Sequence, residues 1–141
     1  MPVRRLLTAL PALAFASFAA SADAAAPIAG RFVTPDGAAV VTVGPCGGAV
    51  CGRLSGVLKI EPGRSPLDVN NSDPALRTRP MMGLPILIGL VDKGKDWRGQ
   101  IYDPRNGKTY KSIVSRNADG SLNVQGCVAF FCQTQVWPKA K

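Results

Sequence analysis

Two arginines stand among carboxylate and amide side chains in the polar segment at residues 61–80, which reads EPGRSPLDVNNSDPALRTRP. Arg77 and Arg79 are two residues apart, and the proline that follows favours extended backbone, so both guanidiniums can project to one side about 7 Å apart. Such a pair can clamp a carboxylate, phosphate or sulfate. The alternative is that the arginines hold their own loop by pairing with Asp68, Asp73 or backbone carbonyls.

The carboxylates and amides of this segment, Asp68, Asn70, Ser72 and Asp73, invite comparison with a calcium loop. They fail the D-x-[DN]-x-[DN]-G pattern, since Ser72 stands at its fifth position and Asp73 where glycine is required. Asn and Asp in such a stretch more often form side-chain turns. Asp68 and Asp73 can also be posed as an acid and base pair for glycan cleavage, but nothing in the sequence sets their environments apart. We therefore predict no metal site and no catalytic residue.

Histidine is absent from the sequence. Without an imidazole there is no Ser-His-Asp or Cys-His nucleophile, no histidine general base and no histidine metal ligand. Most of the common hydrolase mechanisms are thereby excluded, and the sequence favours a protein that is not an enzyme and needs no cofactor.

Aromatic side chains in strand-like segments form the third candidate group. Such residues usually pack in a core or at its rim, although amphipathic ones can line the mouth of a ligand pocket. The candidate ligand-binding residues are Asn70, Asp73, Arg77, Arg79, Trp97, Tyr102 and Tyr110.

The four cysteines fall in two identical spacings, Cys46-x4-Cys51 and Cys127-x4-Cys132. An even count in an exported chain indicates disulfides, and four cysteines allow three connectivities. We favour the two local pairs, because Gly47-Gly48 allows the reversal that brings the first pair within disulfide reach. Pairing across the motifs would stabilise by ~4–5 rather than ~2 kcal/mol, so loop entropy leaves it open. The spacings are poor matches for zinc or a C-x-x-C redox couple.

The N-terminus has the pattern of a cleavable signal peptide. A pair of arginines precedes an apolar run at residues 6–20, and Ala22-Asp23-Ala24 supplies the small-residue cleavage pattern. This run is shorter than the roughly 20 residues that a membrane-spanning helix needs. We expect residues 1–24 to be removed and residues 25–141 to form one exported domain that does not span a membrane.

The expected mature chain is basic. Removal of residues 1–24 leaves 15 basic and 8 acidic side chains, a net charge of +7. Outside the cytoplasm such a surface meets anionic lipid, polysaccharide or an acidic partner rather than nucleic acid. The simpler interpretation is that scattered lysines keep the protein in solution.

Short runs rich in valine, isoleucine, threonine and aromatics are separated by the turn dipeptides Asp-Gly, Gly-Gly and Asn-Gly, a pattern typical of hairpins. The expected strands are 30–34, 38–44, 49–59, 84–92, 97–103, 108–116, 121–127 and 132–137. No segment shows a helical period, so we predict a small antiparallel up-and-down β-barrel of about eight strands with one long polar loop. Such a barrel is either filled by side chains or holds one small ligand.

Several motifs resemble one known family. LDVNNSDPALRTRPMMGLPIL is followed by W-x-G-x-IYDP-x-x-GKTY, then by L-x-V-x-GC and a closing C-x-T-x-x-W. Together with PCGGAVCGRL, these resemble the bacterial exported family known as domain of unknown function 2147. One departure is Phe32, where the family pattern has tryptophan, which keeps a large apolar plug. The resemblance implies a lipocalin-like barrel in the bacterial periplasm and no established activity.

Three functional hypotheses follow. The first is a non-enzymatic periplasmic barrel that binds a small amphipathic or anionic ligand, with the Arg77 and Arg79 loop at its mouth. The second is an envelope interaction or structural protein whose filled barrel presents a basic loop surface to an anionic envelope component. The third, and least favoured, is an enzyme that acts on glycan.

Overall fold

Eight β-strands and one short 3-10 helix make up the regular structure in the computed structural model, which describes residues 16–17, 19 and 23–141. In chain order these are β1 Gly30–Val33, β2 Ala39–Cys46, β3 Ala49–Val57, the helix η1 Pro74–Leu76, β4 Pro85–Asp92, β5 Trp97–Asp103, β6 Lys108–Arg116, β7 Leu122–Val128 and β8 Phe131–Trp137. Every predicted strand is present, with ends displaced by no more than two residues. Most of the predicted signal peptide lies outside the described residues.

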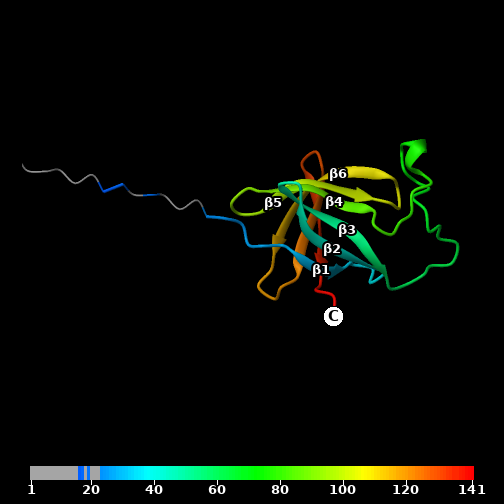
Figure 1. Cartoon of the computed structure of the whole chain (residues 1–141), viewed down its shortest axis with the longest axis horizontal. Helices are drawn as coiled ribbons and strands as arrows, with labels where there is room; N and C mark the ends of the chain where they lie inside the picture. Colours follow the sequence, from blue (N-terminus) through cyan, green and yellow to red (C-terminus); the bar gives the residue numbers. More distant parts are fainter. Residues whose placement is uncertain (1–15, 18, 20–22) are drawn as a thin grey trace, which may run out of the picture.

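The strands follow one another in a simple meander. Each pairs antiparallel with its neighbour in sequence, in the order β1 to β8 (Figure 1). The predicted turn dipeptides all lie between strands, and their glycines have the positive φ that tight hairpin turns require. The prediction of an all-β, up-and-down antiparallel fold is confirmed.

The sheet curls until its first strand meets the chain that follows its last strand. Phe32 of β1 forms an antiparallel bridge with Lys139. The amide of Val33 donates to the carbonyl of Pro138 at 2.8 Å, and the amide of Ala140 donates to the carbonyl of Arg31 at 2.9 Å. These bonds join β1 to residues 138–140 and so close the meander into a barrel.

One half of the barrel interior is packed solid. Inward-facing side chains from nearly every strand are fully buried there, because strand alternation sends every second residue inside. The largest are Phe32, Val41, Leu87, Leu90, Val114, Leu122, Val124 and Trp137. Phe32 is completely buried, as the plug role predicted for it requires.

The segment at residues 25–29 runs across this packed half and closes it (Figure 1). Ile28 is buried in the core, and the Trp97 indole donates to the carbonyl of Ala26 at 2.9 Å. The Arg116 guanidinium donates to the carbonyls of Pro27 and Ala29 at 2.6 and 2.8 Å and stands over the Phe32 ring at 5.6 Å. We call this the closed end of the barrel.

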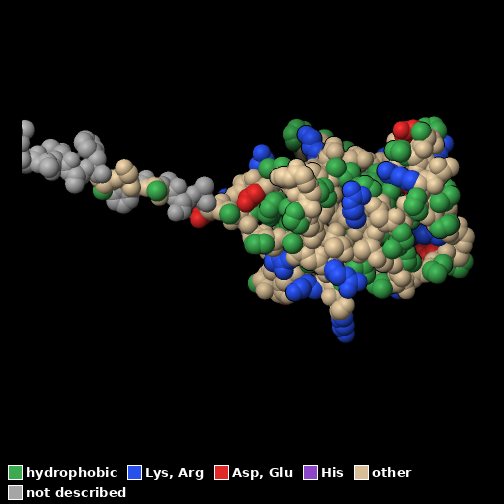
Figure 2. Space-filling view, in the orientation of Figure 1, with side chains coloured by type: hydrophobic (Ala, Val, Ile, Leu, Met, Phe, Trp, Pro, Cys, Tyr) green, Lys and Arg blue, Asp and Glu red, His purple; other side chains and the backbone are tan. Residues whose placement is uncertain are grey.

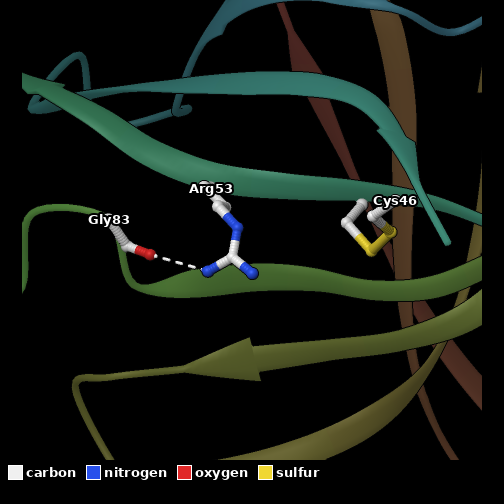
Figure 3. Close-up of a disulfide and its surroundings, with 4 residues drawn as sticks. Cys46, Arg53 and Gly83 are labelled. Atoms are coloured by element: carbon white, nitrogen blue, oxygen red, sulfur yellow. Dashed lines mark hydrogen bonds between the residues drawn. A yellow bond between two sulfur atoms is a disulfide. The ribbon is translucent and has the colours of Figure 1, made fainter.

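The two disulfides join the local pairs that the sequence favoured. Cys46 bonds to Cys51 across the β2–β3 hairpin, and Cys127 bonds to Cys132 across the β7–β8 hairpin. Figure 3 shows the first of them beside Arg53, whose guanidinium donates to the carbonyl of Gly83 at 3.1 Å. Each disulfide staples one hairpin, so neither links distant parts of the sheet.

Lysine and arginine side chains are scattered over the face seen in Figure 2 and do not gather into one patch. This distribution matches the spacing of basic residues along the sequence. In the described part of the chain, no helix is long and apolar enough to cross a membrane.

Candidate functional site: an open cavity in the barrel

The other half of the barrel is hollow. A cavity of about 970 Å³ opens between the β1–β2, β3–β4, β5–β6 and β7–β8 connections, which all lie at the end opposite the closed end. We call this end the mouth. The sequence left open whether the barrel is filled or hollow, and the structure shows one filled half and one open half.

The wall of the cavity is mainly apolar, because strand alternation directs apolar residues inward here as it does in the closed half. Its apolar members include Ala39, Val41, Leu54, Ile86, Ile101 and Trp137. Tyr110, Gln133 and Gln135 place polar groups among them. The Tyr110 hydroxyl accepts from the Asn106 side chain at 2.9 Å, and Gln135 accepts from the Trp137 indole at 3.0 Å.

One polar group next to the cavity lacks a partner. Ser112 is paired with Gly99 and Gly126 on the neighbouring strands and lies on the inward face of β6 with Tyr110. Its hydroxyl is buried and, among the residues that the structure describes, finds no hydrogen-bond acceptor or donor. Ser112 does not line the cavity, but its partner Gly126 on the neighbouring strand does.

Two ion pairs lie at the mouth. Arg105 meets Asp103 at 2.9 Å and Arg64 meets Glu61 at 3.5 Å. Burial opposes ionisation of Asp103, but the hydrogen bonds from Arg105 outweigh it and hold the pKa of that carboxyl below its ordinary value. The rim is therefore polar and charged without a strong excess of either sign.

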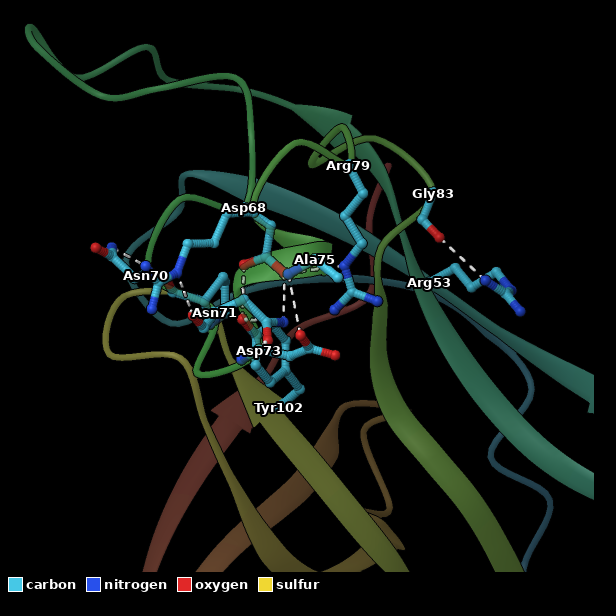
Figure 4. A network of polar contacts seen from close by, with 11 residues as sticks. Arg53, Asp68, Asn70, Asn71, Asp73, Ala75, Arg79, Gly83 and Tyr102 are labelled. Atoms are coloured by element: carbon cyan, nitrogen blue, oxygen red, sulfur yellow. Dashed lines mark hydrogen bonds and ion pairs between the residues drawn. The ribbon is translucent and has the colours of Figure 1, made fainter.

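The long polar loop covers the outer face of the barrel beside the mouth, and a buried carboxylate organises it (Figure 4). Asp68 is 1% exposed and accepts from the Tyr102 hydroxyl at 2.6 Å, from Asn71 at 2.9 Å and from the Arg79 guanidinium at 2.9 Å. Burial alone would raise the pKa of Asp68, but these hydrogen bonds overcome it and lower the pKa. Burial and the bond to Asp68 raise the pKa of Tyr102 to about 12.

The remaining polar residues of the loop hold its backbone. Asp73 accepts from the amide of Ala75 and begins η1, while Arg77 donates to the carbonyl of Asn71 at 2.8 Å. Asn70 donates to the carbonyls of Pro104 and Arg105 in the β5–β6 turn.

That same turn contains Gly107, which has a φ of +70°. A Cβ on Gly107 would collide with the Asn70 carbonyl, so only glycine allows the loop to lie against the turn.

The predicted site residues therefore fall into three groups. Tyr102 and Tyr110 border the cavity, and Trp97 lies at the closed end. Asn70, Asp73, Arg77 and Arg79 make the contacts described above within the loop and to the adjacent turn, and none of the four lines the cavity. The two arginines thus make the loop-holding contacts that the sequence offered as the alternative to an anion clamp.

Several cavity residues were not singled out from the sequence. Phe131, Gln133, Gln135 and Trp137 are alternate residues of one strand that all face the cavity. Their period of two is a signal that the sequence carries, but the mainly polar and exposed residues of β8 do not distinguish a cavity wall from a side that faces solvent.

In the described part of the chain, no three His, Cys, Asp or Glu side chains come together as a potential metal site. Asp68 and Asp73 are also engaged separately, one in the buried network and one at a helix start. The cavity thus offers shape and apolar surface with a few hydrogen-bonding groups, which suits binding.

An eight-stranded antiparallel meander, closed on itself and hollow at one end, has the architecture of a lipocalin-like barrel. A solved structure described as "Protein HP1028 from the human pathogen Helicobacter pylori belongs to the lipocalin family" matches this fold with a TM-score of 0.71 and 22% sequence identity. The match covers 82% of this chain and 84% of that chain.

The chain belongs to the family described as "Uncharacterized protein conserved in bacteria (DUF2147)", whose model matches residues 30–139. The resemblance seen in the sequence motifs is thereby confirmed. A search among curated proteins finds no match.

Proposed function

We propose that this protein is a non-enzymatic binding protein of the bacterial periplasm, which takes up one small amphipathic ligand in the open half of its barrel. The apolar part of the ligand lies in the cavity, and its polar end lies among the paired charges of the mouth. The observation that carries this proposal is the cavity itself, whose volume of about 970 Å³ and apolar wall match the properties of small-molecule sites.

The disposition of polar groups supports an amphipathic ligand over a purely anionic one. The rim arginines Arg64 and Arg105 are each paired with a carboxylate, and Arg77 and Arg79 serve the loop. A ligand with an apolar body and a hydrogen-bonding or zwitterionic end uses both the wall and the paired rim charges. Export after removal of residues 1–24 is part of the proposal, and the stapled hairpins support it, because disulfides persist in oxidising compartments.

The test is uptake of a fluorescent amphiphile, such as a dansylated fatty acid, by two glycine variants. Gly126 lies in the cavity wall, and a Cβ there would meet Ile101 at an ordinary 3.6 Å, so Gly126→Val fills space without a backbone clash. Gly44 lies outside the cavity wall with nothing within 4 Å of its Cβ position, so Gly44→Val is the matched control.

Gly126→Val should weaken binding of the probe several-fold, and Gly44→Val should leave it unchanged. Native mass spectrometry of the protein purified from periplasm should show a bound small molecule. Equal probe binding by both variants, or no uptake by the wild-type protein, would remove the proposal.

A further inference from the structure

The β7–β8 turn exposes four consecutive apolar residues, Val128-Ala-Phe-Phe131. Val128, Phe130 and Phe131 are 60%, 99% and 83% exposed, and we call the hairpin at residues 127–132 the Phe hairpin. Contiguous exposed apolar residues are unusual on the surface of a soluble monomer, because they favour aggregation, and they commonly indicate an interaction site.

The backbone holds this apolar tip outward. Val128 pairs with Phe131, so only Ala129 and Phe130 connect the two strands. Ala129 has a φ of +51°, a conformation that glycine normally supplies in such turns. The Cys127–Cys132 disulfide joins the pair directly below, so the turn cannot relax by separating its strands. Nothing in the packing of the barrel requires Phe130, which contacts almost only solvent.

The Phe hairpin belongs to the rim of the cavity. Val128 and Phe131 line the mouth on one side, and the exposed Val57 and Ile60, at the start of the long loop, also line it. The rim therefore carries apolar side chains that face away from the barrel as well as into it.

Exposed lysines accompany these residues. Lys111 is paired with Cys127 at the base of the Phe hairpin, Lys108 begins the same strand at the mouth, and Lys59 lies at the rim beside Ile60. Exposed aromatic side chains near these lysines, in an expected mature chain with a net charge of +7, complement the headgroup region of an anionic bilayer.

We propose that the mouth of the barrel docks on an anionic lipid bilayer, with Phe130 and Phe131 entering the boundary between headgroups and acyl chains. Phe130 protrudes into solvent, and a soft, deformable surface can receive such a tip without a preformed pocket, which a protein partner would have to supply. Substitution of Phe130 tests this proposal separately from cavity binding, because Phe130 does not line the cavity.

The first experiment is flotation of the disulfide-intact protein with two kinds of vesicle, one of phosphatidylethanolamine and phosphatidylglycerol, the other of phosphatidylcholine. The wild-type protein should float with the anionic vesicles and be released at high salt. Phe130→Ser should reduce the partition coefficient about ten-fold or more, as expected for losing one buried aromatic side chain. Val91→Ser removes another exposed apolar residue from β4, away from the cavity, and should have no effect.

A second measurement reports depth. Phe130→Trp should show a blue-shifted emission with anionic vesicles and should be quenched by brominated acyl chains, after subtraction of the signal from the two native tryptophans. Each variant should retain the wild-type urea midpoint, which confirms that it is folded.

Failure to float, equal flotation of Phe130→Ser and wild type, or an unquenched signal from the introduced tryptophan on bound protein would overturn the proposal. Capture of a protein through position 130 without vesicle binding would also overturn it, in favour of a protein partner. Phe130→Ser should still take up the amphiphile probe, so failure of membrane docking and failure of cavity binding remain distinguishable.

Discussion

Replacement of Asp68 by asparagine tests the buried network that holds the long loop on the barrel. The Asp68 side chain is fully shielded from solvent and accepts three side-chain hydrogen bonds, from Tyr102, Asn71 and Arg79. Asparagine has nearly the same shape, but it lacks the charge and presents an amide donor to groups that are themselves donors.

The expected cost follows from these contacts. A hydrogen bond to a charged group contributes roughly 1.5–3 kcal/mol, but bonds within one network do not add. The Arg79 side chain is also 31% exposed, so water can partly replace its lost partner. We therefore expect Asp68→Asn to lower the free energy of unfolding by about 3 kcal/mol, the lower end of the range for breaking a buried ion pair.

The assay is urea unfolding at neutral pH, followed by far-UV circular dichroism, with limited proteolysis to detect release of the loop at residues 61–80. Asp73→Asn is the matched control, because Asp73 is exposed and asparagine begins a helix as well as aspartate does. A stability loss below about 1 kcal/mol for Asp68→Asn, or equal losses for the two variants, would refute the role assigned to Asp68.

Three further predictions concern titration, the disulfide and the N-terminus. The folded-state pKa of Tyr102 is about 12 and exceeds its value in an unfolded chain, so the neutral hydroxyl stabilises the fold fully below pH ~10. This contribution to the free energy of unfolding is lost as the pH rises toward 12. Urea unfolding of Tyr102→Phe over this pH range should lack that part of the stability loss. The double variant Cys127→Ser with Cys132→Ser should lose about 2 kcal/mol by chemical denaturation, the value for a loop of about six residues, and no loss would show that strand pairing alone closes the hairpin. The amide of Ala25 donates to both carboxylate oxygens of Asp92 at 3.0 and 3.2 Å, so a chain processed before Ala25 should place its new ammonium there; such a chain should melt higher than its N-acetylated form, and Asp92→Asn should abolish the difference.

The strands were predictable from the sequence because their signals are local. Turn dipeptides such as Asp119-Gly120 and alternation such as that of Leu122 and Val124 depend only on neighbours along the chain. The burial of both residues in β7 agrees with the inward face that alternation predicts.

The roles of the loop residues were not predictable to the same degree. Asp68 accepts a hydrogen bond from Tyr102, which lies 34 residues later in the sequence, and the same carboxylate accepts from Arg79. Arg79 therefore faces a carboxylate of its own chain. A spacing of two between arginines predicts only that they share a side. Whether the two guanidiniums face a ligand or other residues of the chain depends on how the loop packs against the sheet.

The boundary between filled and hollow halves was also beyond the sequence. It depends on which inward residues share a level of the barrel, and that is fixed by register shifts such as the one between Ile88 and Val91 in β4. Gly89, at a φ of +58°, marks this irregularity in the sequence, but a glycine does not specify by how much the register shifts.

The separation of the barrel into a packed end and an open end has a consequence for how its sequence can vary. Phe32, Val114 and Leu90 lie in the packed core, where loss of volume costs several kcal/mol. The cavity wall around Ile101 and Gln133 touches empty space, so substitutions there change the shape offered to a ligand at little expense in folding. A barrel of this kind can therefore change its ligand specificity through the cavity wall while the packed core that stabilises the fold is kept.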